Sequence, residues 1–218
     1  MLETNTKLPT DRTLNADWLR LPPGSPGQKI GLFGGSFNPP HSGHRHVALI
    51  ALKRLSLDAV WWLVTPGNPL KTHTDLAPLG ARVAICAAIA NHPRMRITAY
   101  EARIGTAYSA ETIADITTRR QGVDFVWIMG ADNLKNFHNW QHWQQIVDSM
   151  PIAIVDRPGS SLSASATRVA QRFSSSRIRE EDAKSLAGRK APAWVFLHAP
   201  HDESSSTDLR QRRQSTTI

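Results

Sequence analysis

The sequence predicts an α/β fold in which a parallel sheet carries helices on both faces. Short runs rich in β-branched and aromatic residues alternate along the chain with helix-like segments. The strand candidates are apolar throughout rather than alternating, as expected for parallel strands buried on both faces. Several of them end in Gly, Pro, Asn or Asp. Ligands bind at the carboxyl ends of the strands in such sheets, so we expect a site there.

The first half of the sheet follows from composition and turn residues. Residues 29–33 form an apolar run before a glycine pair and are expected to be a strand. Residues 44–55 are mostly apolar and predict a buried helix. Residues 59–64 read AVWWLV and predict a strand that ends at the turn sequence TPGNP. Residues 79–90 have a helical composition, and residues 96–99 are the next strand candidate.

The second half repeats the alternation. Residues 109–120 predict a helix with Ser109 as its N-cap. Residues 125–129 form an apolar strand candidate that stops at Gly130, and residues 140–147 look helical. The remaining expectations are strands at 152–155 and 194–197, a loop with a surface helix within the Ser- and Arg-rich residues 157–191, and a short final helix at 207–214.

The 218 residues are enough for one domain with a sizeable core, which we expect at residues 29–213, followed by a short tail at 214–218. Residues 1–28 are polar, contain four prolines and lack the apolar core of a secretory signal, so they predict a loosely ordered extension. The single cysteine, Cys86, excludes an internal disulfide and indicates a reducing, cytoplasmic setting. No apolar run approaches the roughly 20 residues of a membrane span, so no membrane partner is expected.

The chain is basic, with a formal charge of +8. Such a balance suits anionic partners, either nucleic acid or phosphorylated small molecules, and a solvated basic surface is the alternative. A nucleic-acid-binding module would interleave aromatic and basic residues on one surface. The arginines near the end of the chain, Arg210, Arg212 and Arg213, have no such aromatic neighbours. We therefore expect no nucleic-acid partner.

The stretch GGSFNPPHSGHRHVALI combines a glycine pair, two histidines and a helix start. Gly34 and Gly35 permit positive φ and a close approach of backbone to ligand. The free N–H groups and the dipole of the following helix favour an anion, and His41 and His44 lie about one turn apart. A polyphosphate fits all three features. A metal site that includes His46 is the rival, although no Cys, Asp or Glu lies within the stretch to complete it. Simple capping of the helix by the histidines is the other alternative.

The segment GGSFNPPHSGH resembles the signature of the nucleotidyltransferases with an HxGH motif, and it is most similar to the bacterial nicotinate-nucleotide adenylyltransferases. Further similar segments follow in the family's order and extend the resemblance over about residues 29–213. They are PGNPLK at 66–71, YS at 108–109, GADN at 130–133, FHNW at 137–140, RPG at 157–159 and SSTDLR at 205–210. A second serine-threonine-arginine segment, at 165–168, resembles the last of these, but its arginine comes two places too early. We therefore favour 205–210.

The resemblance implies a Rossmann-like fold and transfer of AMP from ATP to nicotinic acid mononucleotide in NAD biosynthesis. The products would be pyrophosphate and deamido-NAD, Mg²⁺ would arrive with ATP, and the protein would need no metal site of its own. The attacking phosphate is already ionised near neutral pH, so neither a general base nor a covalent intermediate is required. Rival acceptors are nicotinamide mononucleotide, phosphopantetheine and a small phosphorylated alcohol. The sequence leaves open whether the protein is a homo-oligomer.

The resemblance also implies roles for individual residues. The catalytic residues would be His41, His44, Lys71 and Arg210. The ATP-binding residues would be Gly34, Gly35, Ser36, Phe37, Gly130, Asp132, Ser206 and Thr207. The residues that bind nicotinic acid mononucleotide would be Asn68, Tyr108, Ser109, Trp140 and Arg157. Two alternatives stay open: Asp132 as a helix N-cap and Trp140 as a core residue. Trp61 and Trp62 are expected to be core residues.

Overall fold

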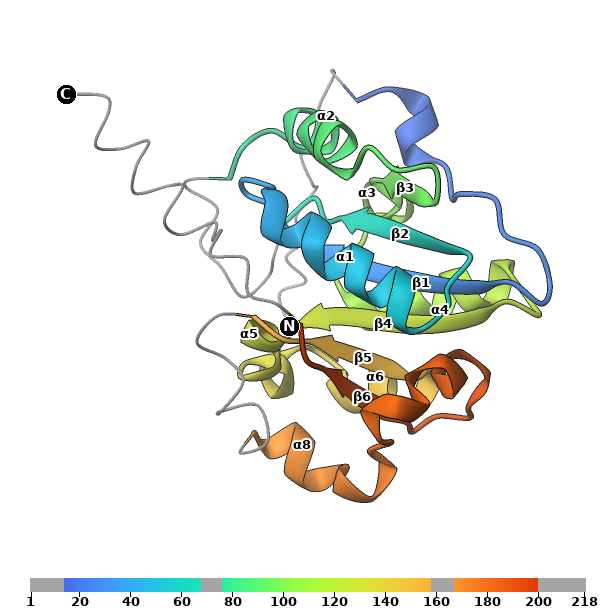
Figure 1. Cartoon of the computed structure of the whole chain (residues 1–218). Helices are drawn as coiled ribbons and strands as arrows, with labels where there is room; N and C mark the ends of the chain where they lie inside the picture. Colours follow the sequence, from blue (N-terminus) through green and yellow to red (C-terminus); the bar gives the residue numbers. More distant parts are fainter. Residues whose placement is uncertain (1–13, 68–75, 158–166, 200–218) are drawn as a thin grey trace, which may run out of the picture.

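The computed structural model describes residues 14–67, 76–157 and 167–199, and it contains a six-stranded parallel sheet (Figure 1). The strand order is β3-β2-β1-β4-β5-β6, and every neighbouring pair is parallel. This confirms the expected fold class. The strands are β1 (Lys29–Gly35), β2 (Ala59–Val64), β3 (Met95–Thr98), β4 (Asp124–Gly130), β5 (Ile152–Val155) and β6 (Trp194–Leu197).

The order of the strands reverses between β1 and β4, which are neighbours in the sheet. In an open parallel sheet this reversal leaves a crevice at the carboxyl ends of the two central strands. The register aligns Gly35 with Val64 of β2 and Gly130 with Val155 of β5. The segments that follow these four strands therefore leave the sheet at one edge, where the sequence placed the site.

Alternate residues of the strands point into two apolar cores, one on each face of the sheet. Trp62 lies in one core and Trp61 in the other, and both are fully buried, which confirms them as core residues. Helices α1 (Ser42–Arg54), α2 (Leu79–Ala90) and the 3-10 segment η4 (Glu180–Gly188) cover the Trp62 face. Helices α3 (Tyr100–Ile104), α4 (Ser109–Arg119), α6 (Trp143–Ser149) and α8 (Arg168–Arg172) cover the Trp61 face. The short segments are η1 (Ala16–Leu19), α5 (Ala131–Leu134), η2 (Phe137–Asn139) and η3 (Ser174–Ser176).

Most expected elements are present, with shifts at their ends. The strands at 59–64, 152–155 and 194–197 and the helix at 79–90 have the expected bounds. Helix α1 begins two residues before the expected position, and α6 begins three residues after it. The short helix α3 was not expected. The expected helix at 207–214 lies outside the described residues.

Residues 14–28 differ from the expected loosely ordered extension, because they pack against the domain. Trp18 and Leu19 contact the apolar core. The Thr98 hydroxyl donates to the carbonyl of Trp18 at 3.0 Å and to that of Arg20 at 2.9 Å. The Ala99 N–H donates to the Trp18 carbonyl at 2.7 Å. Residues 14–28 therefore cover the end of edge strand β3.

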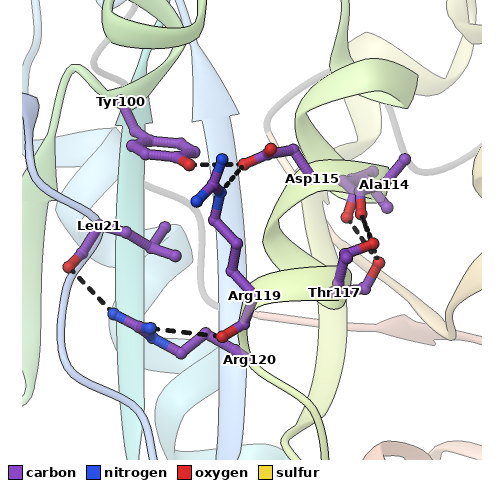
Figure 2. Close-up of polar contacts among 9 residues, drawn as sticks. Leu21, Tyr100, Ala114, Asp115, Thr117, Arg119 and Arg120 are labelled. Atoms are coloured by element: carbon purple, nitrogen blue, oxygen red, sulfur yellow. Dashed lines mark hydrogen bonds and ion pairs between the residues drawn. The ribbon is translucent and has the colours of Figure 1, made fainter.

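A second group of contacts fastens the same segment to α4 (Figure 2). The Arg120 guanidinium donates to the carbonyl of Leu21 at 3.4 Å. It also donates to the carbonyl of Pro22 at 3.1 Å. One turn earlier, Asp115 accepts hydrogen bonds from the Tyr100 hydroxyl and from the Arg119 side chain. The bond from Arg119 is the main cause that lowers the pKa of Asp115. Helices α3 and α4 are thereby joined to each other and to the amino-terminal segment.

Within the described ranges, no helix combines the length and the hydropathy that a bilayer crossing requires.

Candidate active site

Strand β1 leads into the site through Gly34 and Gly35, and neither glycine has a positive φ. This corrects the expected reason for the glycine pair. A Cβ at Gly34 would lie 2.6 Å from the buried ring of Trp127, and one at Gly35 would lie 3.1 Å from the ring of Phe37. Side-chain packing thus requires a glycine at position 34, and it leaves little room for a Cβ at position 35. The left-handed residue is Phe37, whose φ is 46° and whose buried ring stacks on Trp62 at 5.1 Å.

Helix α1 begins directly after this turn, with His41 as its N-cap. The His41 N–H donates to Nδ1 of His44 at 3.2 Å, and the centroids of the two rings are 3.8 Å apart. The capping alternative is therefore correct for His44, but it does not exclude a ligand. A ring nitrogen that accepts a hydrogen bond carries no proton, so the proton of the neutral His44 ring is on Nε2. Nε2 remains the nitrogen that can donate to a ligand.

The surroundings of His44 keep its ring neutral. Its pKa is well below the usual value of 6.5, first because the ring is buried and then because the charges of His41 and Arg157 oppose protonation. The Phe37 ring packs edge-on against it with 5.0 Å between centroids. At neutral pH, His44 therefore presents an N–H donor without a full positive charge. A hydrogen bond from this donor is strengthened by the low local dielectric.

The ends of β4 and β5 bring Gly130, Asp132 and Arg157 together. A Cβ at Gly130 would lie 2.4 Å from Oδ1 of Asp132 and 2.8 Å from Cδ of Arg157. Arg157 pairs with Asp132 at 3.4 Å between Nη1 and Oδ2. Gly130 is the N-cap of α5, so Asp132 is not an N-cap. Because the charge of Arg157 also acts on His44, these residues belong to one site with α1.

The first turn of α4 carries Tyr108 and Ser109. Its N-cap is Tyr108, and Ser109 is the first helical residue, which corrects the expected capping role of Ser109. The Tyr108 N–H instead donates to the Thr106 hydroxyl at 3.0 Å. Beneath this turn, the Thr112 hydroxyl donates to the buried carboxyl of Glu101 at 3.1 Å. Burial raises the pKa of Glu101 to about 7.

Trp140 follows η2 and is half-buried, outside any helix. Its ring meets Phe137 and Trp127 edge-on, with 5.3 Å and 6.3 Å between centroids. Trp127 also packs against Gly34, so an aromatic wall extends from the end of β1 to Trp140. Trp140 is therefore fixed by the core on one side while part of its surface stays accessible.

One prominent residue of this region was not predicted. Arg82 of α2 is fully buried and hydrogen-bonds to the carbonyl of Ser36, next to the turn that carries Phe37. Its signal in the sequence is a lone charge in the apolar helix LGARVAICAAIA. The other expected residues Asn68, Lys71, Ser206, Thr207 and Arg210 lie outside the described residues.

The described residues bear on two alternatives from the sequence, namely the second serine-threonine-arginine segment, which ends at Arg168, and a metal site. Arg168 is an exposed residue at the start of the five-residue helix α8, and Thr167 caps this helix by accepting from the Ala170 N–H at 3.3 Å. Among residues 14–67, 76–157 and 167–199, no three His, Cys, Asp or Glu side chains gather in a way that could hold a metal ion.

The strand order, its reversal between β1 and β4, and a histidine-bearing helix start after β1 together define a nucleotide-binding α/β protein of the nucleotidyltransferase class. The family model described as cytidylyltransferase-like matches residues 32–212. A Rhizobium meliloti (strain 1021) protein named "Probable nicotinate-nucleotide adenylyltransferase" is 56% identical over 184 residues, covering 84% of this chain and 98% of that protein. The chain belongs to the nicotinate-nucleotide adenylyltransferase family, and it is a nucleotidyltransferase of NAD biosynthesis.

Other comparisons agree with this assignment. A protein of the same name from Agrobacterium fabrum (strain C58 / ATCC 33970) is 54% identical over 185 residues, covering 85% of this chain and 99% of that protein. The structure of Plasmodium falciparum nicotinic acid mononucleotide adenylyltransferase complexed with APC superposes with a TM-score of 0.61. That match has 15% sequence identity and covers 84% of this chain and 83% of the other, so it supports the fold.

Proposed function

We propose that this chain transfers the AMP group of ATP to nicotinic acid mononucleotide, forming deamido-NAD and releasing pyrophosphate in a domain spanning residues 29–213. The observation that carries the proposal is the state of His44. The His41 N–H occupies its Nδ1 at 3.2 Å, and the surrounding burial and charge keep the ring neutral. Nε2–H is thus a fixed donor at the crevice between β1 and β4. A donor held in place before the reaction stabilises developing phosphate charge without reorganisation.

The ATP phosphates would lie at the amino end of α1. This helix has 13 residues, and its free N–H groups and dipole favour an anion. His44 would donate to the α-phosphate, next to His41 and to the Gly34–Phe37 backbone with Ser36. By family resemblance, the β- and γ-phosphates would be held by Lys71, Ser206, Thr207 and Arg210.

Arg157 and Asp132 would serve the two nucleotides from the ends of β5 and β4. Arg157 is close enough to oppose the protonation of His44, so its guanidinium suits the phosphate of the acceptor beside the α-phosphate. Asp132 is exposed and would accept hydrogen bonds from the ATP ribose. Two phosphates that repel one another would thereby be aligned by fixed donors. Such alignment supplies much of the rate enhancement when the nucleophile needs no activation.

The pyridine ring of the acceptor would lie against Trp140, whose opposite side is fixed by Phe137 and Trp127. The carboxylate of nicotinate would bind at the amino end of α4, where Tyr108 and Ser109 are half-buried. The dipole of this 11-residue helix favours a negative group at that end. Asn68 is the remaining residue that the family resemblance assigns to this nucleotide.

Mg²⁺ would reach the site on the ATP phosphates. The site offers the Nε2–H of His44 as a donor and the guanidinium of Arg157 as a cation. Both suit phosphate oxygens. The carboxylate of Asp132 is paired with Arg157 at 3.4 Å. Mg²⁺ commonly keeps several waters and binds through substrate phosphates, and it neutralises the charge of the leaving pyrophosphate.

The test is a pyrophosphate-release assay with ATP against a panel of acceptor phosphates. The panel contains nicotinic acid mononucleotide, nicotinamide mononucleotide and phosphopantetheine. We expect kcat/KM for the acid to exceed that for the amide by roughly 100-fold, because an amide leaves buried donors facing donors. Equal values for acid and amide would refute the carboxylate site, and turnover of phosphopantetheine alone would refute the proposed acceptor.

A further inference from the structure

Arg82 is a buried charged residue whose hydrogen bonds converge on the ends of two strands. It is 1% exposed. Its Nε donates to the Ala77 carbonyl at 2.9 Å, and its Nη1 donates to the carbonyls of Ser36 at 2.6 Å and Thr65 at 2.8 Å. Its Nη2 donates to the Pro66 carbonyl at 3.3 Å. One guanidinium therefore binds four backbone carbonyls from three separate segments.

These segments surround the turn between β1 and α1. Ser36 is the first residue after β1, Thr65 and Pro66 follow β2, and Ala77 lies just before α2. A second bond joins the same region, because the Ala77 N–H donates to Oδ1 of Asn38 at 3.2 Å. The end of β1 is thus fastened both to the end of β2 and to the start of α2.

The geometry of Arg82 distinguishes it from a phosphate ligand. A guanidinium has five N–H donors in a rigid fork, and four of the bonds of Arg82 go to carbonyls. Burial of a charge is costly unless its donors are satisfied, so carbonyl oxygens in these positions stabilise both the charge and the backbone. A lysine has three donors on a flexible stem and cannot reproduce this arrangement.

We propose that Arg82 is a positioning residue for adenylyl transfer, which fixes the Ser36 turn and the end of β2 in the arrangement that the reaction needs. The inference rests on the proposed function. Ser36 begins the turn that leads to His41, so a shift of this turn would move the phosphate donors of α1. A misplacement of about 1 Å by a remote mutation can lower a rate about 100-fold.

The test compares Arg82→Lys with Arg94→Lys in the pyrophosphate-release assay. Arg94 is a matched control, because its Nη1 also donates to a carbonyl, that of Leu57 at 3.2 Å, but at the amino-terminal edge of the sheet. Both variants and the unmodified chain are assayed well below their own Tm, with the folded fraction measured by circular dichroism. We expect kcat/KM of Arg82→Lys, per folded molecule, to fall roughly 10- to 100-fold. Arg94→Lys should stay within about 2-fold, as expected of an exposed site.

A second variant keeps the proposal testable if Arg82→Lys does not fold. Asn38→Ala removes the other bond between the same segments, and Asn38 is only partly buried. It should lower kcat by roughly 3- to 10-fold, since it loosens the turn that leads to His41 without removing the bonds of Arg82. A purely structural role for Arg82 would lower Tm and leave kcat and both KM values of the folded molecules unchanged. That result, or unchanged kinetics in Asn38→Ala when Arg82→Lys is unfolded, would overturn the proposal. No turnover by the unmodified chain would overturn the proposed function itself and the inference with it.

Discussion

His44 has two tasks in this structure, and two substitutions can separate them. Its Nδ1 accepts the His41 N–H at 3.2 Å, which stabilises the start of α1, while its Nε2–H is proposed to bind the α-phosphate. His44→Asn places Oδ1 near the position of Nδ1 and keeps an acceptor for His41, but it has no group at the position of Nε2. His44→Ala removes both.

The magnitudes follow from these contacts. Loss of a helix-capping hydrogen bond costs about 1 kcal/mol of stability, so His44→Ala should be less stable than His44→Asn by about that amount. Loss of a donor that stabilises transition-state charge costs about 3–4 kcal/mol, so both variants should lose roughly 100- to 1,000-fold in kcat. Urea unfolding and the pyrophosphate-release assay measure the two quantities.

The pH dependence provides an independent check. The pKa of His44 is lowered in the folded state, whereas the unfolded chain binds a proton near pH 6.5. The free energy of unfolding should therefore fall as the pH drops below 6.5, and His44→Asn should lack this component. Near-normal kcat in a folded His44→Asn variant would refute the phosphate role, and equal stability of both variants would refute the capping role.

Three further outcomes are expected. Gly34→Ala should destabilise the fold by about 1–3 kcal/mol in urea unfolding because its Cβ would lie 2.6 Å from a buried tryptophan ring, whereas Gly188→Ala, with open space around it, should have little effect. Glu101→Gln should raise the free energy of unfolding by about 1–3 kcal/mol at pH 8 but not at pH 4. The reason is that the folded-state pKa of Glu101 is about 7, so the stability contributed by its protonated carboxyl is lost as the pH rises through 7. An equal gain at both pH values would contradict this. Ser109→Ala should lower the ratio of kcat/KM for nicotinic acid mononucleotide to kcat/KM for its amide, whereas Trp140→Ala should reduce both values alike. The reverse pattern would show that the ring and carboxylate subsites are misassigned.

Elements set by local pattern could be predicted closely from the sequence. The run AVWWLV gave strand β2 with its observed bounds, and the apolar helix at 79–90 was also placed correctly. Their limits are marked by turn residues, which act locally. The family resemblance also named Gly130, Asp132 and Arg157, which the structure brings together.

The sequence alone determined which residue types stand at each strand end, because period and turn chemistry are local properties. It could not determine why they are there. Gly34 looked like a residue for a left-handed turn, yet Trp127, 93 positions away, is what excludes a Cβ, and Phe37 takes the positive φ. The carbonyl partners of Arg82 and the contact of residues 14–28 with β3 likewise depend on segments that meet only in the folded chain. Tertiary packing decides such features, since it fixes distances between residues that no local pattern relates.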